Sequence, residues 1–219
     1  MKRIGGRHLP DHRYARLSAL EADSGELNVI IETPKGSRNK FNYDDEHDLF
    51  KLGGVLPAGA VFPFDFGFLP NTLGGDGDPL DVLVLMEESA FAGCLVASRL
   101  IGVIEAEQTE EDGEITRNDR LIAVAANSRS HGDVTSLEDL NANLVKEIEH
   151  FFVSYNEIKG KRFRPLGRFG PERAARLVKA GIQSAGRRGA KKAGAAKSAK
   201  AKSARAKGLK SRGRSSKSR

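Results

Sequence analysis

The segment from Gly74 to Met86, GGDGDPLDVLVLM, joins an acidic loop directly to an apolar run. The run Leu80–Met86 has the length and composition of a buried strand. In the loop, Gly77 allows the backbone to turn tightly and Pro79 fixes the direction in which the chain leaves. Three carboxylates lie within six residues, on Asp76, Asp78 and Asp81. The segment therefore predicts a turn that gathers negative charge at the start of a core strand.

The three carboxylates favour a metal site. Anions held this close repel one another unless cations offset their charge. Carboxylate oxygens are hard ligands that select magnesium or manganese, and these ions keep waters and recruit phosphate oxygens. The alternative is a solvated acidic turn, because Asp-Gly-Asp segments are common in turns.

Short apolar or β-branched runs on both sides of this segment predict further strands. We expect strands at Leu27–Glu32, Phe41–Tyr43, Ala60–Phe68, Leu80–Met86, Leu95–Ala106 and Leu121–Ala126. Helices are expected to follow them in the chain. Several short strands followed by helices predict an α+β domain, in which a small closed or nearly closed β-barrel has helices packed outside.

The apolar spacing becomes helical after residue 130. Asp133 or Thr135 is expected to cap a short helix, and a longer amphipathic helix is expected over residues 141–158. A third helix is expected to open at Pro171 and to close at Gly181.

Charge is distributed unevenly along the chain. Of the 36 Lys and Arg residues, 14 lie within residues 186–219, which contain no acidic residue, so the first 185 residues carry 22 basic and 29 acidic residues. Residues 186–219 are almost wholly Lys, Arg, Ala, Ser and Gly, a composition that cannot bury a core. We therefore divide the chain into an N-terminal extension (1–26), a folded domain (27–182) and a disordered basic tail (183–219).

The sequence also indicates the cellular location of the protein. Residues Met1–Pro10 contain no apolar h-region, and no run approaches 18 apolar residues. We therefore expect neither a signal peptide nor a membrane span. A single cysteine, Cys94, excludes an intramolecular disulfide and fits a reducing environment. A cytoplasmic protein is predicted.

The motif D-G-D-P-L-D followed by V-L-V-L resembles the signature of soluble inorganic pyrophosphatases of the single-domain, β-barrel, magnesium-dependent family. The resemblance runs from about residue 27 to about residue 169 and includes IIETPKGSRNKFNY at Ile30–Tyr43, FPFDFGF at Phe62–Phe68, LIAV at Leu121–Val124 and HFFVSY at His150–Tyr155. It implies a small closed five-stranded OB-like β-barrel with two or three helices outside. It also implies a homo-oligomer, often a hexamer in bacterial members, that hydrolyses pyrophosphate with Mg²⁺, or alternatively Mn²⁺.

The resemblance also implies a set of active-site residues. Asp78 matches the carboxylate that accepts a proton from the attacking water. The metal-ligand positions correspond to Asp76, Asp81, Asp112, Asp119 and Glu32, with Glu111 as an alternative to Asp112. The phosphate-binding positions correspond to Lys40, Arg120 and Tyr155. The implied mechanism is attack of a metal-activated water on one phosphorus, while cations offset the charge of the departing phosphate.

Six positions depart from the pattern of the family, at Asn42, Gly54, Phe62, Phe66, Asn118 and Asn156. In the same order, the resemblance implies a glutamate, an arginine, two tyrosines, an aspartate and a lysine at these positions. The departures therefore remove cations, carboxylates and hydroxyls from the expected pocket, and the adjacent Asp119 is a candidate substitute for the aspartate lost at Asn118. Nearby basic residues that could compensate are Lys51, Arg162, Arg164 and Arg168. Two hypotheses compete: a divergent hydrolase, and a retuned or weakly active protein that binds phosphate compounds.

The basic tail resembles lysine- and alanine-rich tails that bind nucleic acids. Its charge would attract nucleic acid or polyphosphate without sequence specificity and with strong salt dependence. Alternatively, the tail could fold back on the acidic body or only increase solubility. The competing hypothesis for the whole protein is a nucleoid-associated binding protein built on a pyrophosphatase scaffold, but the three clustered carboxylates favour an enzyme.

Overall fold

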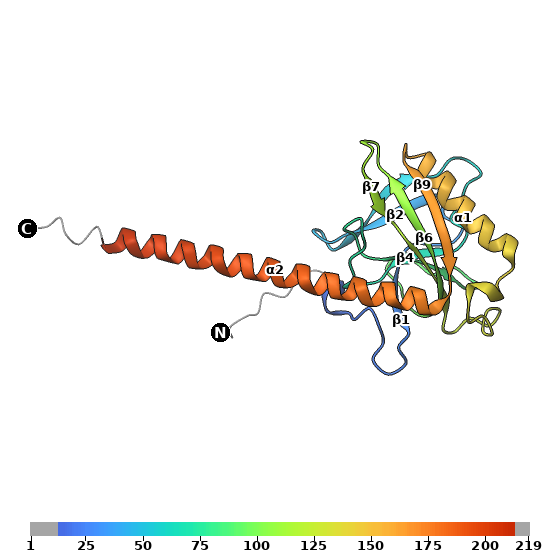
Figure 1. The fold of residues 1–219 in the computed structure, drawn as a ribbon, viewed down its shortest axis with the longest axis horizontal. Helices are drawn as coiled ribbons and strands as arrows, with labels where there is room; N and C mark the ends of the chain where they lie inside the picture. Colours follow the sequence, from blue (N-terminus) through green and yellow to red (C-terminus); the bar gives the residue numbers. More distant parts are fainter. Residues whose placement is uncertain (1–12, 213–219) are drawn as a thin grey trace, which may run out of the picture.

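A computed structural model describes the chain from residue 13 to residue 212 (Figure 1). Within these residues the strands are β1 (Leu27–Thr33), β2 (Asn39–Asp44), β3 (Leu49–Val55), β4 (Asp65–Phe68), β5 (Asp81–Leu85), β6 (Leu95–Thr109), β7 (Ile115–Arg117), β8 (Arg120–Ala125) and β9 (Arg162–Phe169). The helices are α1 (Ala142–Glu157) and α2 (Pro171–Arg212), with short 3-10 turns η1 (Arg13–Arg16) and η2 (Leu137–Asp139).

Five strands close into a ring in the order β1-β4-β5-β8-β6, and the pairing of β1 with β6 completes it. All neighbours in the ring are antiparallel except β5 and β8, which run parallel. Strands β7 and β9 pair with β6 outside the ring, and β2 and β3 form a separate hairpin. The prediction of a five-stranded barrel in an α+β domain is confirmed.

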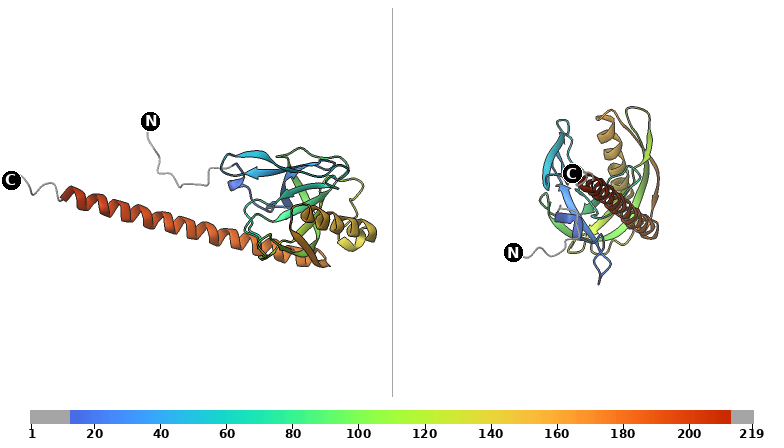
Figure 2. Two further views of the ribbon diagram at one scale, coloured as in Figure 1. Left: turned by 90° about the horizontal axis from the view of Figure 1, so that it is seen from above. Right: turned by 90° about the vertical axis from the view of Figure 1, so that its left-hand side faces the viewer.

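Both faces of the barrel wall are covered, and strand β5 shows how. Along β5 the side chains alternate: Leu83 and Leu85 join a cluster that includes residues of α1, whereas Val82 and Val84 join a cluster that includes residues of α2. All four are fully buried. This explains the continuous apolar run, because a strand covered on both faces has no solvent side. Figure 2 shows the two helices lying against the outside of the barrel.

Three strands were not predicted from sequence. Strand β3 is mostly exposed and contains two glycines, β7 has only three residues, and β9 contains Pro165. Only Phe163 is buried in β9, so apolar periodicity gives no signal there. The short helix expected before residue 141 is the 3-10 turn η2, and its cap is Ser136 rather than Asp133 or Thr135.

The two ends of the predicted domain differ from expectation. Residues 13–26 pack against the domain: Tyr14 is buried and contacts the rings of Tyr43 and Phe68. The remainder of the predicted N-terminal extension lies outside the described residues. Helix α2 does not end at Gly181 but continues to Arg212 and extends well beyond the barrel (Figure 1). The expectation that the tail is disordered in solution stays a prediction. None of the described helices has the length and apolar character to cross a bilayer.

Candidate active site

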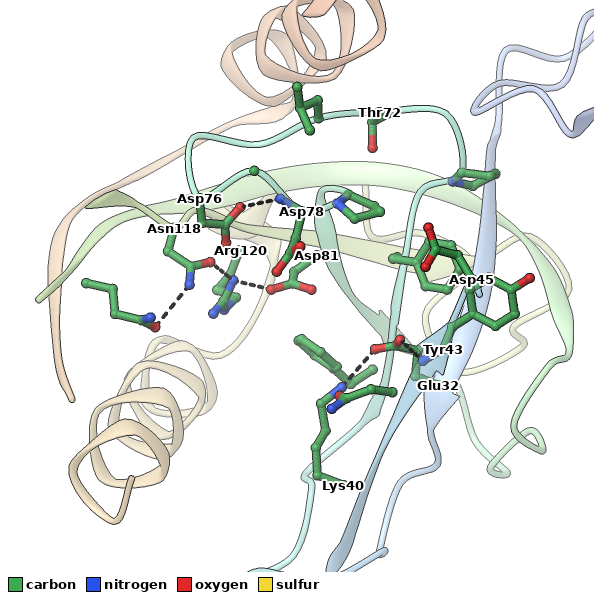
Figure 3. Close-up of a pocket in the computed structure, with 18 of the residues that line it drawn as sticks. Glu32, Lys40, Tyr43, Asp45, Thr72, Asp76, Asp78, Asp81, Asn118 and Arg120 are labelled. Carbon is green, nitrogen blue, oxygen red and sulfur yellow. Dashed lines mark hydrogen bonds and ion pairs between the residues drawn. The ribbon is translucent and has the colours of Figure 1, made fainter. Parts of the chain in front are cut away.

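One pocket of about 840 Å³ collects most of the predicted site residues. It is lined by residues from β1, β2, β5, β8, α1 and the loop before β5, among them Glu32, Lys40, Asp76, Asp78, Asp81, Arg120 and Tyr155. Figure 3 shows the carboxylates of the loop pointing toward the same space as Arg120, with Glu32 and Lys40 on the opposite side. Residues that lie far apart in the sequence therefore meet where the barrel ring brings their strands together.

The carboxylate loop is shaped by its own backbone. Gly77 has a φ of +88°, a conformation that favours glycine, and it stands between the first two aspartates. The amide of Asp78 donates to Oδ1 of Asp76 at 3.2 Å, and the amide of Gly74 donates to the carbonyl of Asp78 at 2.7 Å. These bonds fold the loop back on itself and place Asp81 at the first position of β5.

The loop carboxylates lie in an environment that disfavours their charge. The Asp76 side chain is exposed to solvent, but it lies in a concave pocket whose walls limit the hydration of its carboxylate. This desolvation, with repulsion from Asp81 and Asp78, raises its pKa to about 6. Desolvation and Asp81 also raise the pKa of Asp78. A hard divalent cation would relieve this repulsion, so the donor set fits Mg²⁺. Within the described residues, no three acidic, His or Cys side chains stand close enough together to form a ready metal site, so waters and substrate oxygens would complete the coordination of a bound Mg²⁺.

Arg120 lies buried beside these carboxylates. It opens β8 directly opposite Asp81 on β5, and its guanidinium forms an ion pair with that carboxylate. The same group donates to the side-chain oxygen of Asn118 and lies over the rings of Phe152 and Phe163, at 5.2 and 5.4 Å. Its cation is therefore held at the floor of the pocket, in contact with an expected metal ligand.

Asn118 is paired with a residue that sequence reasoning missed. Its side-chain amide donates to the side-chain oxygen of Gln108 at 3.0 Å, and both buried residues line the pocket. Sequence reasoning considered Asp119 as a substitute for Asn118. However, the Asp119 carboxylate accepts from the amide of Ala106 at 3.0 Å and pairs with Arg117 at 2.8 Å. An uncharged amide pair therefore occupies this side of the pocket.

Two acidic residues proposed from the sequence lie away from the pocket. Asp112 and Glu111 sit on an exposed turn between β6 and β7, and the Asp112 carboxylate accepts from the amide of Glu114 at 3.1 Å. Asp119 faces a separate small hollow behind the loop, which it shares with Asp76 and Asp81. The structure therefore does not bring Asp112 to the carboxylate cluster.

Glu32 has partners that fix it in place. One carboxylate oxygen accepts from Lys40 at 2.8 Å, and the other accepts from the amide of Tyr43 at 2.7 Å. Burial raises the pKa of Glu32, and Lys40 opposes this effect. The Lys40 ammonium also lies 4.4 Å from the centre of the Phe66 ring. The geometry thus makes Glu32 the partner that orients Lys40 toward the pocket.

A cation that the sequence analysis did not identify, Lys159, lies beside Tyr155. Tyr155 packs against Phe62 and Phe151, and its hydroxyl oxygen accepts a hydrogen bond from Lys159. Burial and the neighbouring cations lower the pKa of Lys159. Asn156, where the family has a lysine, is buried and donates to the carbonyl of Phe152 at 2.8 Å. The usable signal was the spacing: Lys159 follows Tyr155 by one helical turn.

The compensating cations proposed from the sequence do not all reach the pocket. Arg164 pairs with Glu107, and Arg168 pairs with Glu149. Arg162 is exposed on the same strand and does not line the pocket. Lys51 does line it, although its ammonium pairs with Asp44 at 2.9 Å. The pocket also contains Lys161, which pairs with Glu110 at 2.6 Å.

The remaining departures fall in two environments. Phe62 and Phe66 are buried in the core cluster that includes α1, so their rings serve packing. Gly54 pairs with Lys40 across the β2–β3 hairpin, and a Cβ at this glycine would meet open space. The hairpin therefore has room for a larger side chain at Gly54, next to the pocket-lining Lys40.

Comparisons with known proteins agree with this geometry. A model of the inorganic pyrophosphatase family matches residues 29–185. The inorganic pyrophosphatase of Geobacillus stearothermophilus is 40% identical over 153 residues, which are 69% of this chain and 89% of that protein. The one from Corynebacterium efficiens is 42% identical over 136 residues, covering 62% of this chain and 82% of that protein.

Solved structures give the same result. The crystal structure of the inorganic pyrophosphatase from Thermus thermophilus superposes with a TM-score of 0.70 and 32% identity, covering 77% of this chain and 96% of that chain. The structure from Neisseria gonorrhoeae gives a TM-score of 0.71 and 30% identity, covering 79% and 98%. With the carboxylate loop, the basic pocket and the five-stranded ring in place, the chain belongs to the inorganic pyrophosphatase family.

Proposed function

We propose that the protein hydrolyses inorganic pyrophosphate to two phosphates in a divalent-cation-dependent reaction. The observation that carries this proposal is the pocket itself. Three loop carboxylates that repel one another face cations on Lys40, Arg120, Lys159 and Lys161. A small, heavily charged substrate needs both: carboxylates to hold its metal ions and cations to bind its phosphates. A protein that only binds phosphate has no need of the carboxylate cluster, so hydrolysis is favoured over the retuned binding protein.

The residues divide into three roles. Asp76 and Asp81 would hold Mg²⁺, which when bound lowers the pKa of a coordinated water. Asp78 accepts the proton as the water oxygen bonds to one phosphorus. The bridging P–O bond breaks, and its electron pair leaves with the second phosphate. Lys40, oriented by Glu32, and Arg120 offset the charge of the phosphates, while Tyr155 and Lys159 lie where the departing phosphate can be contacted. Three expected ligands are left out of the set. Asp112 lies on an exposed turn away from the pocket, Asp119 is held by the Ala106 amide and Arg117, and the oxygens of Glu32 are occupied by Lys40 and the Tyr43 amide.

The test is phosphate release from pyrophosphate, tripolyphosphate and nucleotides, with Mg²⁺, with Mn²⁺ and with a chelator. We expect activity with pyrophosphate that the chelator abolishes. Asp78→Asn removes the proton acceptor and should reduce kcat by about 10²–10⁴-fold. Asp112→Asn is the matched control, because it makes the same chemical change on an exposed turn and should leave kcat unchanged. Chelator-resistant hydrolysis, or a larger loss in Asp112→Asn than in Asp78→Asn, would overturn the assignment.

Three further proposals concern the binding partners, the oligomeric state and the cellular location of the enzyme. Residues 186–219, with 14 cations and no acid, support binding of nucleic acid or polyphosphate. The family resemblance supports a homo-oligomer, and a hexamer in particular. The single cysteine supports a cytoplasmic location.

A further inference from the structure

The base of helix α2 is anchored beside the carboxylate loop. Ala174 and Val178 are buried in the core, and one turn later Gly181 touches the loop. A Cβ at Gly181 would lie 2.7 Å from a methyl carbon of Leu80, so a larger residue here would require the Leu80 side chain to shift. The Gly181 carbonyl accepts from the amide of Leu73 at 3.1 Å. Helix and loop are thus joined at the N-terminal side of the loop.

The next two turns of α2 form part of the pocket. Ala185, Arg188 and Gly189 line it, and they follow Gly181 by four, seven and eight residues, which places all four on one helix face. In Figure 3 this helix, in faint orange at the top, passes over the loop that carries Thr72 and Asp76. Because three of the four residues are Gly or Ala, the helix backbone approaches closely and Arg188 alone carries a long side chain.

Arg188 makes the second connection to the loop. Its Nη1 donates to the carbonyl of Gly77 at 2.9 Å. Gly77 is the turning point between Asp76 and Asp78, so this bond holds the residue that sets how those two carboxylates are aimed. The guanidinium also brings a positive charge close to Asp78. The loop is therefore restrained at its N-terminal side by Gly181 and at its turning point by Arg188.

We propose that Arg188 is a positioning residue of the active site, and that the face of α2 formed by Gly181, Ala185, Arg188 and Gly189 is the wall that holds the carboxylate loop in its metal-binding shape. The proposal rests on the proposed hydrolase function for its kinetic consequence. A restrained Gly77 keeps the two flanking carboxylates, Asp76 and Asp78, pointing toward the same space, which lowers the entropic cost of holding a metal ion there. The boundary between domain and tail then falls after Gly189 rather than at residue 183.

The experiment uses the full-length chain and three variants: Arg188→Ala, Arg188→Lys and the matched control Arg187→Ala. Binding of Mn²⁺ is followed through the electron paramagnetic resonance of the free ion, and steady-state kinetics with pyrophosphate give kcat and KM. Loss of one hydrogen bond from a charged donor predicts about a five-fold weaker Mn²⁺ affinity and a similar fall in kcat for Arg188→Ala. KM at saturating metal should change less. Arg188→Lys should recover most of the affinity, and Arg187→Ala should match the wild type.

Several outcomes would overturn the positioning role. One is an Mn²⁺ affinity in Arg188→Ala equal to that of the wild type. Another is an equal loss in Arg187→Ala, which would mean that the loss does not depend on the hydrogen bond to Gly77. A third is no recovery in Arg188→Lys at an unchanged melting temperature. Failure of the proposed function has a different signature: the wild type releases no phosphate, although Mn²⁺ affinity still distinguishes the Arg188 and Arg187 variants.

Discussion

Asp81 and Arg120 are register partners on the parallel strands β5 and β8, and their side chains form an ion pair on the floor of the pocket. The Arg120 side chain is only 5% exposed, whereas that of Asp81 is 25% exposed. The pair is therefore open on its carboxylate side. A metal ion that binds Asp81 and a phosphate that binds Arg120 both reach this ion pair from the pocket. Binding of either one weakens the ion pair and so makes the other residue more available to its own ligand.

Replacing Arg120 tests this coupling. Arg120→Gln leaves Asp81 without its cation and removes a phosphate donor, so kcat/KM should fall by about 10²–10³-fold. The free energy of unfolding should fall by about 2–3 kcal/mol, less than for a fully buried pair because Asp81 is partly solvated. Arg120→Lys keeps the positive charge but lacks the planar guanidinium, so its kcat/KM and its free energy of unfolding should lie between those of the wild type and Arg120→Gln. Phosphate release and urea unfolding measure the two effects, and a fully active Arg120→Gln would refute the role.

Lys159 is expected to act as the cation that the family places elsewhere. Lys159→Met should raise KM for pyrophosphate about ten-fold, since one cation near the departing phosphate is lost. The control is Lys146→Met, because Lys146 is an exposed lysine on α1 that does not line the pocket. Steady-state kinetics of the two variants decide the matter: equal KM values would mean that Lys159 makes no contact with substrate.

The room on the hairpin at Gly54 predicts a gain from restoring donors. Gly54 has open space above it, so Gly54→Arg can be accommodated, and Phe66→Tyr adds a hydroxyl to a ring already beside Lys40. The double variant should lower KM for pyrophosphate several-fold, by about the effect of one or two charge-assisted hydrogen bonds. The wild type should also accept tripolyphosphate better than the double variant does. If the two proteins show the same KM, the lysines already present supply all the hydrogen bonds that the phosphates can use.

Metal affinity should depend on pH through Asp76. Its folded pKa of about 6 lies above the ordinary value of 3.8, so the metal-free protein gains a proton on this group as pH falls through 6. Mg²⁺ must then displace that proton, and calorimetry should show weaker binding at pH 5.5 than at pH 7.5. The stability of the metal-free protein depends on pH in the opposite direction from its metal affinity. A raised carboxyl pKa means that the contribution of this group to stability is lost as pH rises from about 4 to about 6. In Asp76→Asn, both the Mg²⁺ affinity and the stability of the metal-free protein should change less with pH.

The basic tail is expected to bind polyanions by charge alone. The full-length protein should bind duplex DNA and polyphosphate at low salt, and log affinity should fall steeply and linearly with log salt. A variant with the Lys and Arg residues after residue 190 changed to Gln keeps the wall formed by α2 and should lose this binding while retaining phosphate release. Fluorescence anisotropy across a salt series measures it. Equal binding by the two proteins would place the polyanion site on the folded domain instead.

The sequence predicts the parts of this protein whose signal is local. Leu80–Met86 is a continuous apolar run because β5 is covered on both faces, and Asp76, Asp78 and Asp81 stand together in the chain as well as in the pocket. Strand β9 was missed because it is mostly exposed and contains Pro165, so no periodicity marks it.

Other site features depend on tertiary packing. Gln108 acts through Asn118, a neighbour that only the fold provides. The reach of Arg188 to Gly77 depends on where α2 lies against the loop, and no spacing in the chain encodes that. Gly181 was interpreted as a helix end because glycine usually ends helices. Here it permits close contact with Leu80 instead.

Closure of the ring has a consequence for the order in which the chain folds. Leu27 pairs with Ser98, roughly 70 residues later, and contacts of such sequence separation form slowly because a long loop must be closed first. During synthesis, β1 leaves the ribosome well before its partner β6 exists. Its apolar residues Leu27 and Val29, which pair with β6, must wait unpaired until then. Substitutions that weaken β1 pairing are therefore expected to reduce the yield of folded protein more than the activity of the molecules that do fold.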